Sequence, residues 1–227
     1  MTRETYLAIE GYMLHCMDDS AHDAEHVYRV LYNALEIAKA EPDTDYDVLI
    51  AACLLHDIGR ADQFSDPSLC HAKVGSEKAF VFLTALGLSN SFCNHVCACI
   101  ASHRFRREEP PASIEAKILF DADKLDVTGA MGIARTLLYQ GTLQAPLYTL
   151  RNDGSISDGK DDLQETFFRE YHFKLEKLYT QFFTSRGKEL ALQRRSAAAA
   201  FHDALLSEIR NTYENGQAQL HLYLNSP

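Results

Sequence analysis

The sequence predicts an all-α fold. Apolar residues recur at helical spacing in nearly every segment, as in the face made by Val27, Val30, Leu31 and Ala34. No run of alternating apolar and polar residues is regular enough to predict a β-strand. Gly and Pro stand between the periodic segments, where helices end. The expected helices cover about 2–18, 22–40, 45–57, 71–86, 89–104, 112–140, 161–184 and 187–214.

In the first half of the chain, each expected helix has an apolar stripe and a break before the next one. The first segment, MTRETYLAIEGYMLHCMDD, places polar and apolar residues at helical period. Pro42 and Asp43 precede the third helix, Pro67 precedes the fourth, and Gly87 closes the fourth. The stripes of the third and fourth helices contain Leu49, Ala52, Cys53 and His56, and Val74, Ala79, Phe82, Leu83 and Leu86.

In the second half, a Pro-Pro pair at 110–111 precedes one long expected helix at 112–140. The segment NDGSISDGKDD at 152–162 is the most polar in the chain, and its glycines and serines give it little means of packing. We therefore expect a mobile loop there. The AAAA run at 197–200 is a strong helix former, which supports the last expected helix.

The composition predicts one domain spanning residues 1–227. A chain of 227 residues with 46% hydrophobic residues can bury one sizeable core, and it contains no long Gly/Ser/Pro linker. We expect a core at about 20–140 and a helical extension at about 160–215.

The charge excludes one class of partner. Lys and Arg number 22 against 32 Asp and Glu, which gives a net charge of −10 without a basic stripe. Long nucleic acid is therefore not expected to bind, whereas small phosphorylated molecules remain compatible with a local site. The oligomeric state does not follow from the sequence.

The sequence also predicts a cytoplasmic protein. It contains neither a signal peptide nor a run of about 18 apolar residues, so we expect no membrane helix. The six cysteines mostly lie within apolar helical patterns, and we expect them to be reduced.

The stretch LIAACLLHDIGRAD ends a buried helical face with an imidazole and a carboxylate. His56 closes the apolar stripe and Asp57 follows it directly. Adjacent helical residues diverge by about 100°, so both can meet one ion only where the helix ends. Gly59 is suited to that ending.

Two further segments supply groups of the same chemistry. AHDAEHVYRV places His22 and His26 at i, i+4 on one helical face. ILFDADKLD places Asp121, Asp123 and Asp126 in an otherwise apolar helix, where carboxylates are costly unless a positive group meets them. A divalent cation would meet them, and imidazole with carboxylate suits iron, manganese, zinc or a similar metal.

These residues resemble the HD-domain superfamily of metal-dependent phosphohydrolases, whose pattern is H…HD…D on separate helices of an all-α fold. His26 before VYRV looks like the first His, His56 and Asp57 match the doublet, and Asp123 in ADKL matches the last ligand. The resemblance implies that these four residues hold the metal. DADKLDVTGAMGIAR and EYHFKLEKL are also similar to segments of compact, single-domain bacterial HD proteins, so the resemblance extends along the whole chain.

The alternatives at these positions stay open. His22 is the alternative to His26 on helical geometry. Asp126 shares the face of Asp123 at i+3, whereas Asp121 points elsewhere, and both remain alternatives as the last ligand. His56 and Asp57 also have a purely structural interpretation, which would leave a buried carboxylate without a partner.

His71 and His103 are candidates for a second metal. HD proteins with two ions use a further His in roughly each of these places, and the alternative is that both bind water or phosphate. CNHVCAC, around His95, looks like a zinc site, but its cysteines do not share one helical face, so buried thiols are the better interpretation.

Two cations are candidates for phosphate binding. Arg60 follows the doublet, where related proteins often carry Lys or Arg, and its guanidinium suits a phosphate oxygen. The alternative for Arg60 is a surface ion pair with Asp62. Lys124, next to Asp123, is a second candidate. The RFRREE cluster at 104–109 is expected to be solvated or to line the rim of the pocket.

The resemblance implies hydrolysis of a nucleotide or another small phosphate ester. One ion or two, of Fe, Mn, Mg, Co, Ni or Zn, would lower the pKa of a bound water and polarise a phosphoryl oxygen. Asp57 would orient the water, and Arg60 with His71 or His103 would neutralise charge or protonate the leaving oxygen.

The sequence lacks the signatures of two HD branches, which makes the substrates of those branches less expected. The doublet is followed by Ile58, Gly59 and Arg60 and not by the Glu-Asp pair of alarmone hydrolases, and no Gly-Tyr-Pro signature of cyclic-dinucleotide phosphodiesterases accompanies it. Two alternative functions are a non-catalytic metal- or ligand-binding HD module and a di-iron oxygenase, for which the chain has enough histidines.

Overall fold

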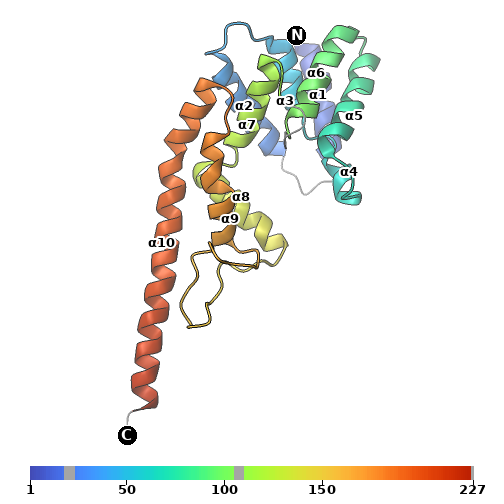
Figure 1. Cartoon of the computed structure of the whole chain (residues 1–227). Coiled ribbons are helices and arrows are strands. Elements are labelled where there is room, and N and C mark those ends of the chain that lie inside the picture. Colours follow the sequence, from blue (N-terminus) through green and yellow to red (C-terminus); the bar gives the residue numbers. More distant parts are fainter. Residues whose placement is uncertain (18–23, 105–109, 226–227) are drawn as a thin grey trace. The chain divides into compact units, whose positions relative to one another are not determined.

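The computed structural model describes residues 1–17, 24–104 and 110–225, and Figure 1 labels their elements. The all-α prediction is confirmed: all the elements of these residues are helices, and an isolated bridge joins Leu150 to Ile156. The chain divides into two compact units. Unit 1 comprises Met1–Asp126 and Phe182–Glu189, and unit 2 comprises Val127–Gln181 and Leu190–Pro227.

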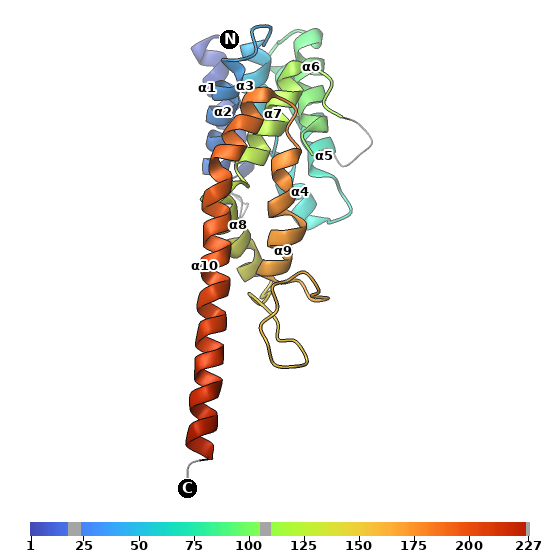
Figure 2. The same cartoon turned by 60° about the vertical axis from the view of Figure 1, so that its left-hand side comes forward.

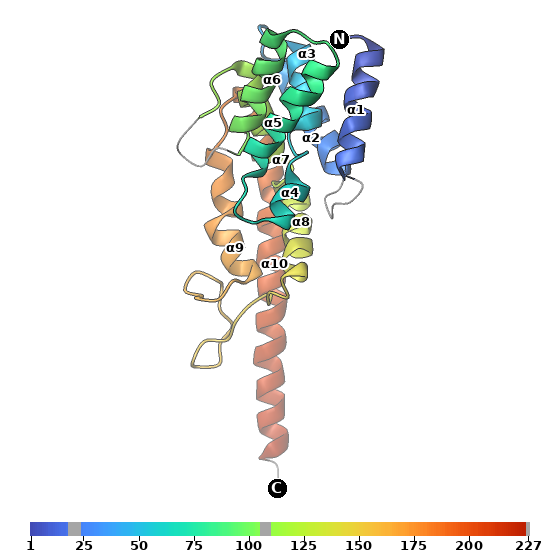
Figure 3. The ribbon, with the colours of Figure 1, turned by 90° about the vertical axis from the view of Figure 1, so that its right-hand side faces the viewer.

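Unit 1 is a helical bundle built around α3. This helix is buried on nearly its whole surface, because seven of its ten residues are apolar and inaccessible, and it packs against α1, α2, α6 and α7. Figure 2 shows α1, α2, α3 and α7 beside one another, and Figure 3 shows α5 and α6. The helices of unit 1 are α1 Arg3–Met17, α2 Ala24–Ala38, α3 Tyr46–Leu55, α4 Arg60–Ser65, α5 His71–Ala85, α6 Asn90–Ser102 and α7 Ile114–Leu125.

Side-chain caps fix where several of these helices begin. Asp45 accepts hydrogen bonds from the backbone N–H groups of Asp47 and Val48 at the start of α3. Ser89 and Ser113 cap α6 and α7 in the same way. The short helix α4, directly after the HD doublet, was not among the expected elements.

The long helix expected at 112–140 is interrupted. α7 ends at Leu125 and α8 begins at Gly129. Gly129 has a φ of +62°, a left-handed conformation that an α-helix does not continue through. The sequence has no proline at this break, and its apolar periodicity continues across it, so the sequence pattern does not reveal where α7 ends.

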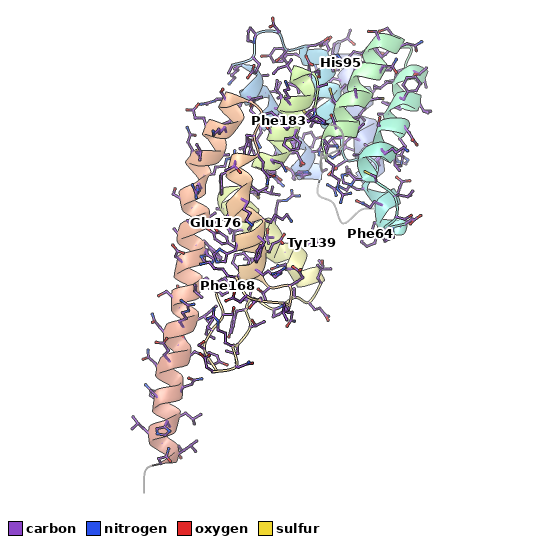
Figure 4. The ribbon with its side chains drawn as sticks, in the orientation of Figure 1. Phe64, His95, Tyr139, Phe168, Glu176 and Phe183 are labelled. Carbon is purple, nitrogen blue, oxygen red and sulfur yellow. The ribbon has the colours of Figure 1, made fainter. Side chains whose placement is uncertain are left out.

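Unit 2 contains α8 Gly129–Thr142, α9 Phe167–Phe173, the 3₁₀-helix η1 Leu175–Thr180 and most of α10 Ser185–Leu224. The helix expected at 161–184 is thus shorter and ends in a 3₁₀ segment, and the last helix extends beyond 214. Figure 4 labels Phe168, which belongs to the apolar core of this unit. That core is formed by Ile133, Phe167, Phe168, Tyr171, Leu175, Leu178 and Ala198.

The polar segment 152–162 packs more than its composition predicts. Ile156 and Ser157 are buried, and Asp162 accepts hydrogen bonds from the hydroxyls of Thr149 and Thr166. These hydrogen bonds tie the end of the segment to the start of α9. Serines and aspartates here satisfy backbone and hydroxyl groups, a role that composition alone does not reveal.

All six cysteines are free thiols, as expected. Among the described helices, none is both long enough and apolar enough to cross a bilayer.

Candidate metal centre

Five helices of unit 1 bring imidazoles and carboxylates to one place, each from a helix end. His26 lies in the first turn of α2, and His71 opens α5. His56 and His103 are the C-cap residues of α3 and α6. Asp123 stands in the last turn of α7. Helix ends are the positions at which neighbouring side chains can turn toward a shared point, as the sequence analysis argued for the HD doublet.

The potential ligand atoms form two groups. The first group is His26, His56 and Asp123, and the second group is Asp57, His71 and His103; within each group the ligand atoms lie within 4.8 Å of one another. All six residues were candidates on sequence grounds, and the structure divides them between the two groups.

Asp57 also contacts the first group. Its Oδ2 lies 3.6 Å from Nε2 of His26 and 3.6 Å from Nε2 of His56. Its Oδ1 lies 3.6 Å from Nε2 of His71 and 3.5 Å from Nε2 of His103. One carboxylate therefore presents one oxygen to each group.

Backbone carbonyls fix the tautomers of two imidazoles. Nδ1 of His56 lies 2.7 Å from the carbonyl oxygen of Cys53, and Nδ1 of His103 lies 2.6 Å from that of Ile100. A carbonyl oxygen only accepts hydrogen bonds, so Nδ1 donates in both rings. In the neutral imidazole, Nε2 then carries a lone pair.

Side chains fix the tautomers of the other two. Nδ1 of His26 lies 2.7 Å from Oδ2 of Asp126. Nδ1 of His71 lies 2.7 Å from Oε1 of Gln63, whose amide is oriented because its Nε2 donates to the carbonyl of Leu69. Arg104 Nη1 is more distant from His71 Nδ1, at 3.4 Å, so the shorter contact with Gln63 decides the tautomer.

As a result, four Nε2 lone pairs face two carboxylates. His71 Nε2 and His103 Nε2 are 3.3 Å apart, and with Nδ1 as the protonated nitrogen of each neutral ring neither Nε2 can donate to the other. Nε2 of His56 and Oδ2 of Asp57 are buried and have no hydrogen-bond partner in the described part of the chain. An orphaned buried polar atom costs about 1–3 kcal/mol. The donor set and its orphaned atoms fit a divalent cation bound by imidazole and carboxylate.

The protonation states also suit metal binding. Burial lowers the pKa of His56 to about 4 and that of His71 to about 3, so both rings are neutral at pH 7. Burial by itself would raise the pKa values of Asp57 and Asp123. Both pKa values nevertheless lie well below the usual range of a carboxyl, because the adjacent imidazoles take up protons first as the pH falls and then stabilise the carboxylates, and Arg60 does the same for Asp57. The groups thus have the deprotonated forms that a metal requires.

Asp121, Asp123 and the C-cap Asp126 of α7 have different surroundings, although all three belong to one otherwise apolar segment of the sequence. Asp121 accepts from the N–H groups of Phe183 and Thr184 and from the Thr184 hydroxyl, at 2.6–2.9 Å. Figure 4 labels Phe183, whose ring packs edge-on against Phe120 of α7. Asp126 binds the outer nitrogen of His26, and only Asp123 belongs to a ligand group.

The two candidate phosphate-binding cations lie differently. Arg60 opens α4 and donates from Nε to Asp57 Oδ1 at 2.9 Å, and its side chain is 27% exposed. No further hydrogen bond of its guanidinium is formed with the residues that the structure describes. The ammonium of Lys124 lies 4.5 Å from the centroid of the Phe120 ring.

Other residues of the sequence analysis lie away from both groups or outside the described residues. His95 pairs with Glu115, Cys97 contacts the Ser76 carbonyl and Cys99 approaches Ser113, so CNHVCAC does not converge. Figure 4 labels His95 on α6. His22 and residues 105–109 of the RFRREE cluster lie outside the described residues.

The residues that orient these imidazoles could not be recognised in the sequence. Gln63 has no distinguishing pattern there, and Asp126 was only an alternative ligand. Arg29 was noted only as part of VYRV, yet it binds Asp126. Their partners lie up to 100 residues away in the chain, so no local spacing signals them.

Comparison with known proteins finds relatives that match most of this chain. A profile of the HD domain matches residues 23–128, a range that contains both ligand groups. The uncharacterized protein YpgQ of Bacillus subtilis (strain 168) is 29% identical over 196 residues, covering 85% of this chain and 86% of YpgQ.

Two solved structures have a similar fold. A predicted HD superfamily hydrolase from an uncultured Thermotogales bacterium is 31% identical and has a TM-score of 0.61, with 88% of this chain and 90% of that chain covered. B. subtilis YpgQ in complex with ADP is 25% identical, with a TM-score of 0.68 and with 88% and 97% covered. With its H…HD…D residues gathered in one helical bundle, the chain belongs to the HD domain family.

Proposed function

We propose that the chain is a metal-dependent phosphohydrolase that acts on a nucleotide or another small phosphate ester. The observation that carries the proposal is the convergence of four imidazole lone pairs on two ionised carboxylates. A phosphorylated ligand is also supported by the ADP complex of YpgQ. In the proposed organisation, one HD domain has its core at about 20–140 and its helical extension at about 160–215.

The first group, completed by Asp57, would hold one divalent ion of Fe, Mn, Mg, Co, Ni or Zn. The second group supports a second ion, because Asp57 offers one oxygen to each group. A bound ion supplies Lewis acidity for a phosphoryl oxygen and lowers the pKa of water toward neutrality.

The remaining roles belong to side chains around the two groups. Arg60 holds Asp57 through Nε, which leaves its other nitrogens to bind a phosphoryl oxygen and stabilise the charge that develops on it. His71 and His103 are both buried beside Asp57, so either can orient water if it does not bind an ion. Lys124 is the second candidate for a phosphate contact.

Phosphate release tests the proposal. Protein stripped with a chelator is incubated with ADP or p-nitrophenyl phosphate, with and without added Mn²⁺, Co²⁺, Ni²⁺, Zn²⁺ or Mg²⁺. We expect hydrolysis only with metal, its loss in His103→Ala and its retention in His95→Ala, a matched change on the same helix. Absence of metal-dependent hydrolysis from every ester tried, in a protein that binds the ions, would favour the non-catalytic module.

The second group also suits a di-iron oxygenase, because it adds two histidines to the first. The same assay separates this function from hydrolysis, since hydrolysis proceeds without oxygen and with ions that do not change oxidation state. We expect equal rates of phosphate release in air and under nitrogen.

A further inference from the structure

The residue behind His26 differs from those behind the other imidazoles. Asp126, the C-cap of α7, is 2% exposed and accepts from His26 Nδ1 at 2.7 Å. On the opposite side of the ring, His26 Nε2 lies 3.3 Å from Asp123 Oδ1. The ring of His26 therefore lies between a carboxylate of the first group and a carboxylate outside it.

Arg29 fixes the position of the Asp126 carboxylate. Its Nε donates to Oδ1 at 2.7 Å and its Nη2 donates to Oδ2 at 3.2 Å. Arg29 stands one turn after His26 on α2, so both residues of α2 bind the same carboxylate of α7. A two-toothed guanidinium contact restricts both the position and the rotation of a carboxylate.

His26 alone has an ionised acceptor among the four imidazoles. His56 and His103 donate to backbone carbonyls, and His71 donates to the neutral amide of Gln63. A carboxylate that accepts from the outer nitrogen of a metal-binding His fixes the tautomer and raises the basicity of the ligating nitrogen.

We propose that Asp126, held by Arg29, is the positioning residue of the first group: it keeps the proton of His26 on Nδ1 and directs the Nε2 lone pair toward Asp57 and Asp123. This inference rests on the proposed role of His26 as a metal ligand. It assigns to Asp126 a role distinct from ligation, and it gives Arg29 a function in the same site.

Asp126→Asn tests the inference with little change in volume. Both oxygens of Asp126 accept hydrogen bonds, so an Asn side chain would turn its NH₂ group toward a donor, either Arg29 or His26, whichever way it rotates. Asp121→Asn is the matched control. Asp121 is on the same helix, is buried, and also accepts through both oxygens, but its donors are Phe183 and Thr184.

Two measurements on the full chain read out the role. The first is the tautomer of His26 in chelator-treated protein near pH 8.5, taken from two-bond ¹⁵N–¹H NMR correlations of the ring. The second is the affinity for Mn²⁺, taken from the EPR signal of the free ion. We expect Nδ1–H in the wild type and in Asp121→Asn, and a mixture with Nε2–H in Asp126→Asn. We expect about a 10–100-fold loss of Mn²⁺ affinity in Asp126→Asn only.

Thermal denaturation separates positioning from folding, because both Asn variants are expected to melt at a lower temperature. If Asp126→Asn does not fold, Arg29→Gln replaces it: the carboxylate stays, its restraint is lost, and a smaller loss of affinity is expected. An unchanged tautomer, or equal Mn²⁺ affinity in Asp126→Asn and the wild type, would overturn the inference. A folded wild type that binds neither Mn²⁺ nor, on dialysis, Co²⁺, Ni²⁺ or Zn²⁺ would overturn the proposed function and, with it, this inference.

Discussion

Replacement of Gly59 by Ala should damage the second ligand group through a single methyl group. Gly59 lies in the turn between α3 and α4, with φ −92° and ψ 4°, values that Ala also adopts. A Cβ atom at position 59 would lie 2.7 Å from the backbone nitrogen of Gly75 and closer still to the carbonyl oxygen of His71. The glycine is thus required by the close approach of α5, the helix that carries His71.

The size of the effect follows from these contacts. Ordinary van der Waals contact needs about 3.5 Å, so the backbone of α5 has to retreat by roughly 1 Å. Overpacking of this kind costs about 1–3 kcal/mol of stability. A displacement of about 1 Å of a group in an active site can cost on the order of 10²-fold in rate. Because His71 opens α5, the second group is expected to lose its geometry before the first.

Gly75→Ala supplies the control on the opposite side of the same contact. A Cβ at position 75 meets its nearest heavy atom at 3.4 Å, so it fits without displacing backbone. Gly75 lies inside α5, where Ala is favoured over Gly by about 1 kcal/mol. Melting temperature and kcat/KM for the best substrate are measured for both variants. A Gly59→Ala protein with wild-type stability and activity would refute the reasoning.

Three further predictions concern the ligand groups and their surroundings. Asp123→Asn should abolish metal-dependent activity, whereas Asp121→Asn should mainly lower the melting temperature; equal activity of the two variants would contradict the assignment of Asp123. Arg60→Ala should lower kcat/KM by about 10²-fold or more. Arg60→Lys keeps the charge but loses the two-toothed geometry, so its loss should appear partly in kcat and not only in KM. An unchanged kcat/KM in Arg60→Ala would move the phosphate contact to Lys124. Urea unfolding of chelator-treated protein should show the free energy of unfolding falling as the pH is lowered from 6.5 to about 4, because His56 stays neutral in the fold but binds a proton when unfolded. The loss from this residue is about 3 kcal/mol. A free energy of unfolding that does not change over this pH range would be inconsistent with the burial of His56.

The fold class could be predicted from apolar spacing, and the candidate site residues could be proposed from a family motif whose members each lie near a helix end. Apolar spacing identified most of unit 1, and the doublet His56-Asp57 was correctly placed at the end of α3. The break at Gly129 was missed, since the requirement for a left-handed residue there does not disturb the apolar period. The helix expected at 161–184 was wrong for a similar reason: periodic residues continue through a 3₁₀ segment that packs the unit 2 core.

The support of the site depends on contacts between distant segments. Asp126 and His26 are 100 residues apart, and the sequence does not reveal which ring nitrogen of His26 donates to a carboxylate. The partners of Asp121 lie directly before α10, and their hydrogen bonds explain a buried carboxylate without any metal. Equal residue types on one helix therefore acquire different roles from tertiary packing.

Elemental analysis of protein purified without chelators tests the central claim most directly, since that claim is that converging Nε2 lone pairs and carboxylates hold a divalent ion. The wild type should retain one or two equivalents of a divalent transition metal per chain, His56→Ala should retain markedly less, and His95→Ala should match the wild type. A wild-type protein that remains folded, carries no metal and takes up none on dialysis against Mn²⁺, Co²⁺, Ni²⁺ or Zn²⁺ would contradict the claim.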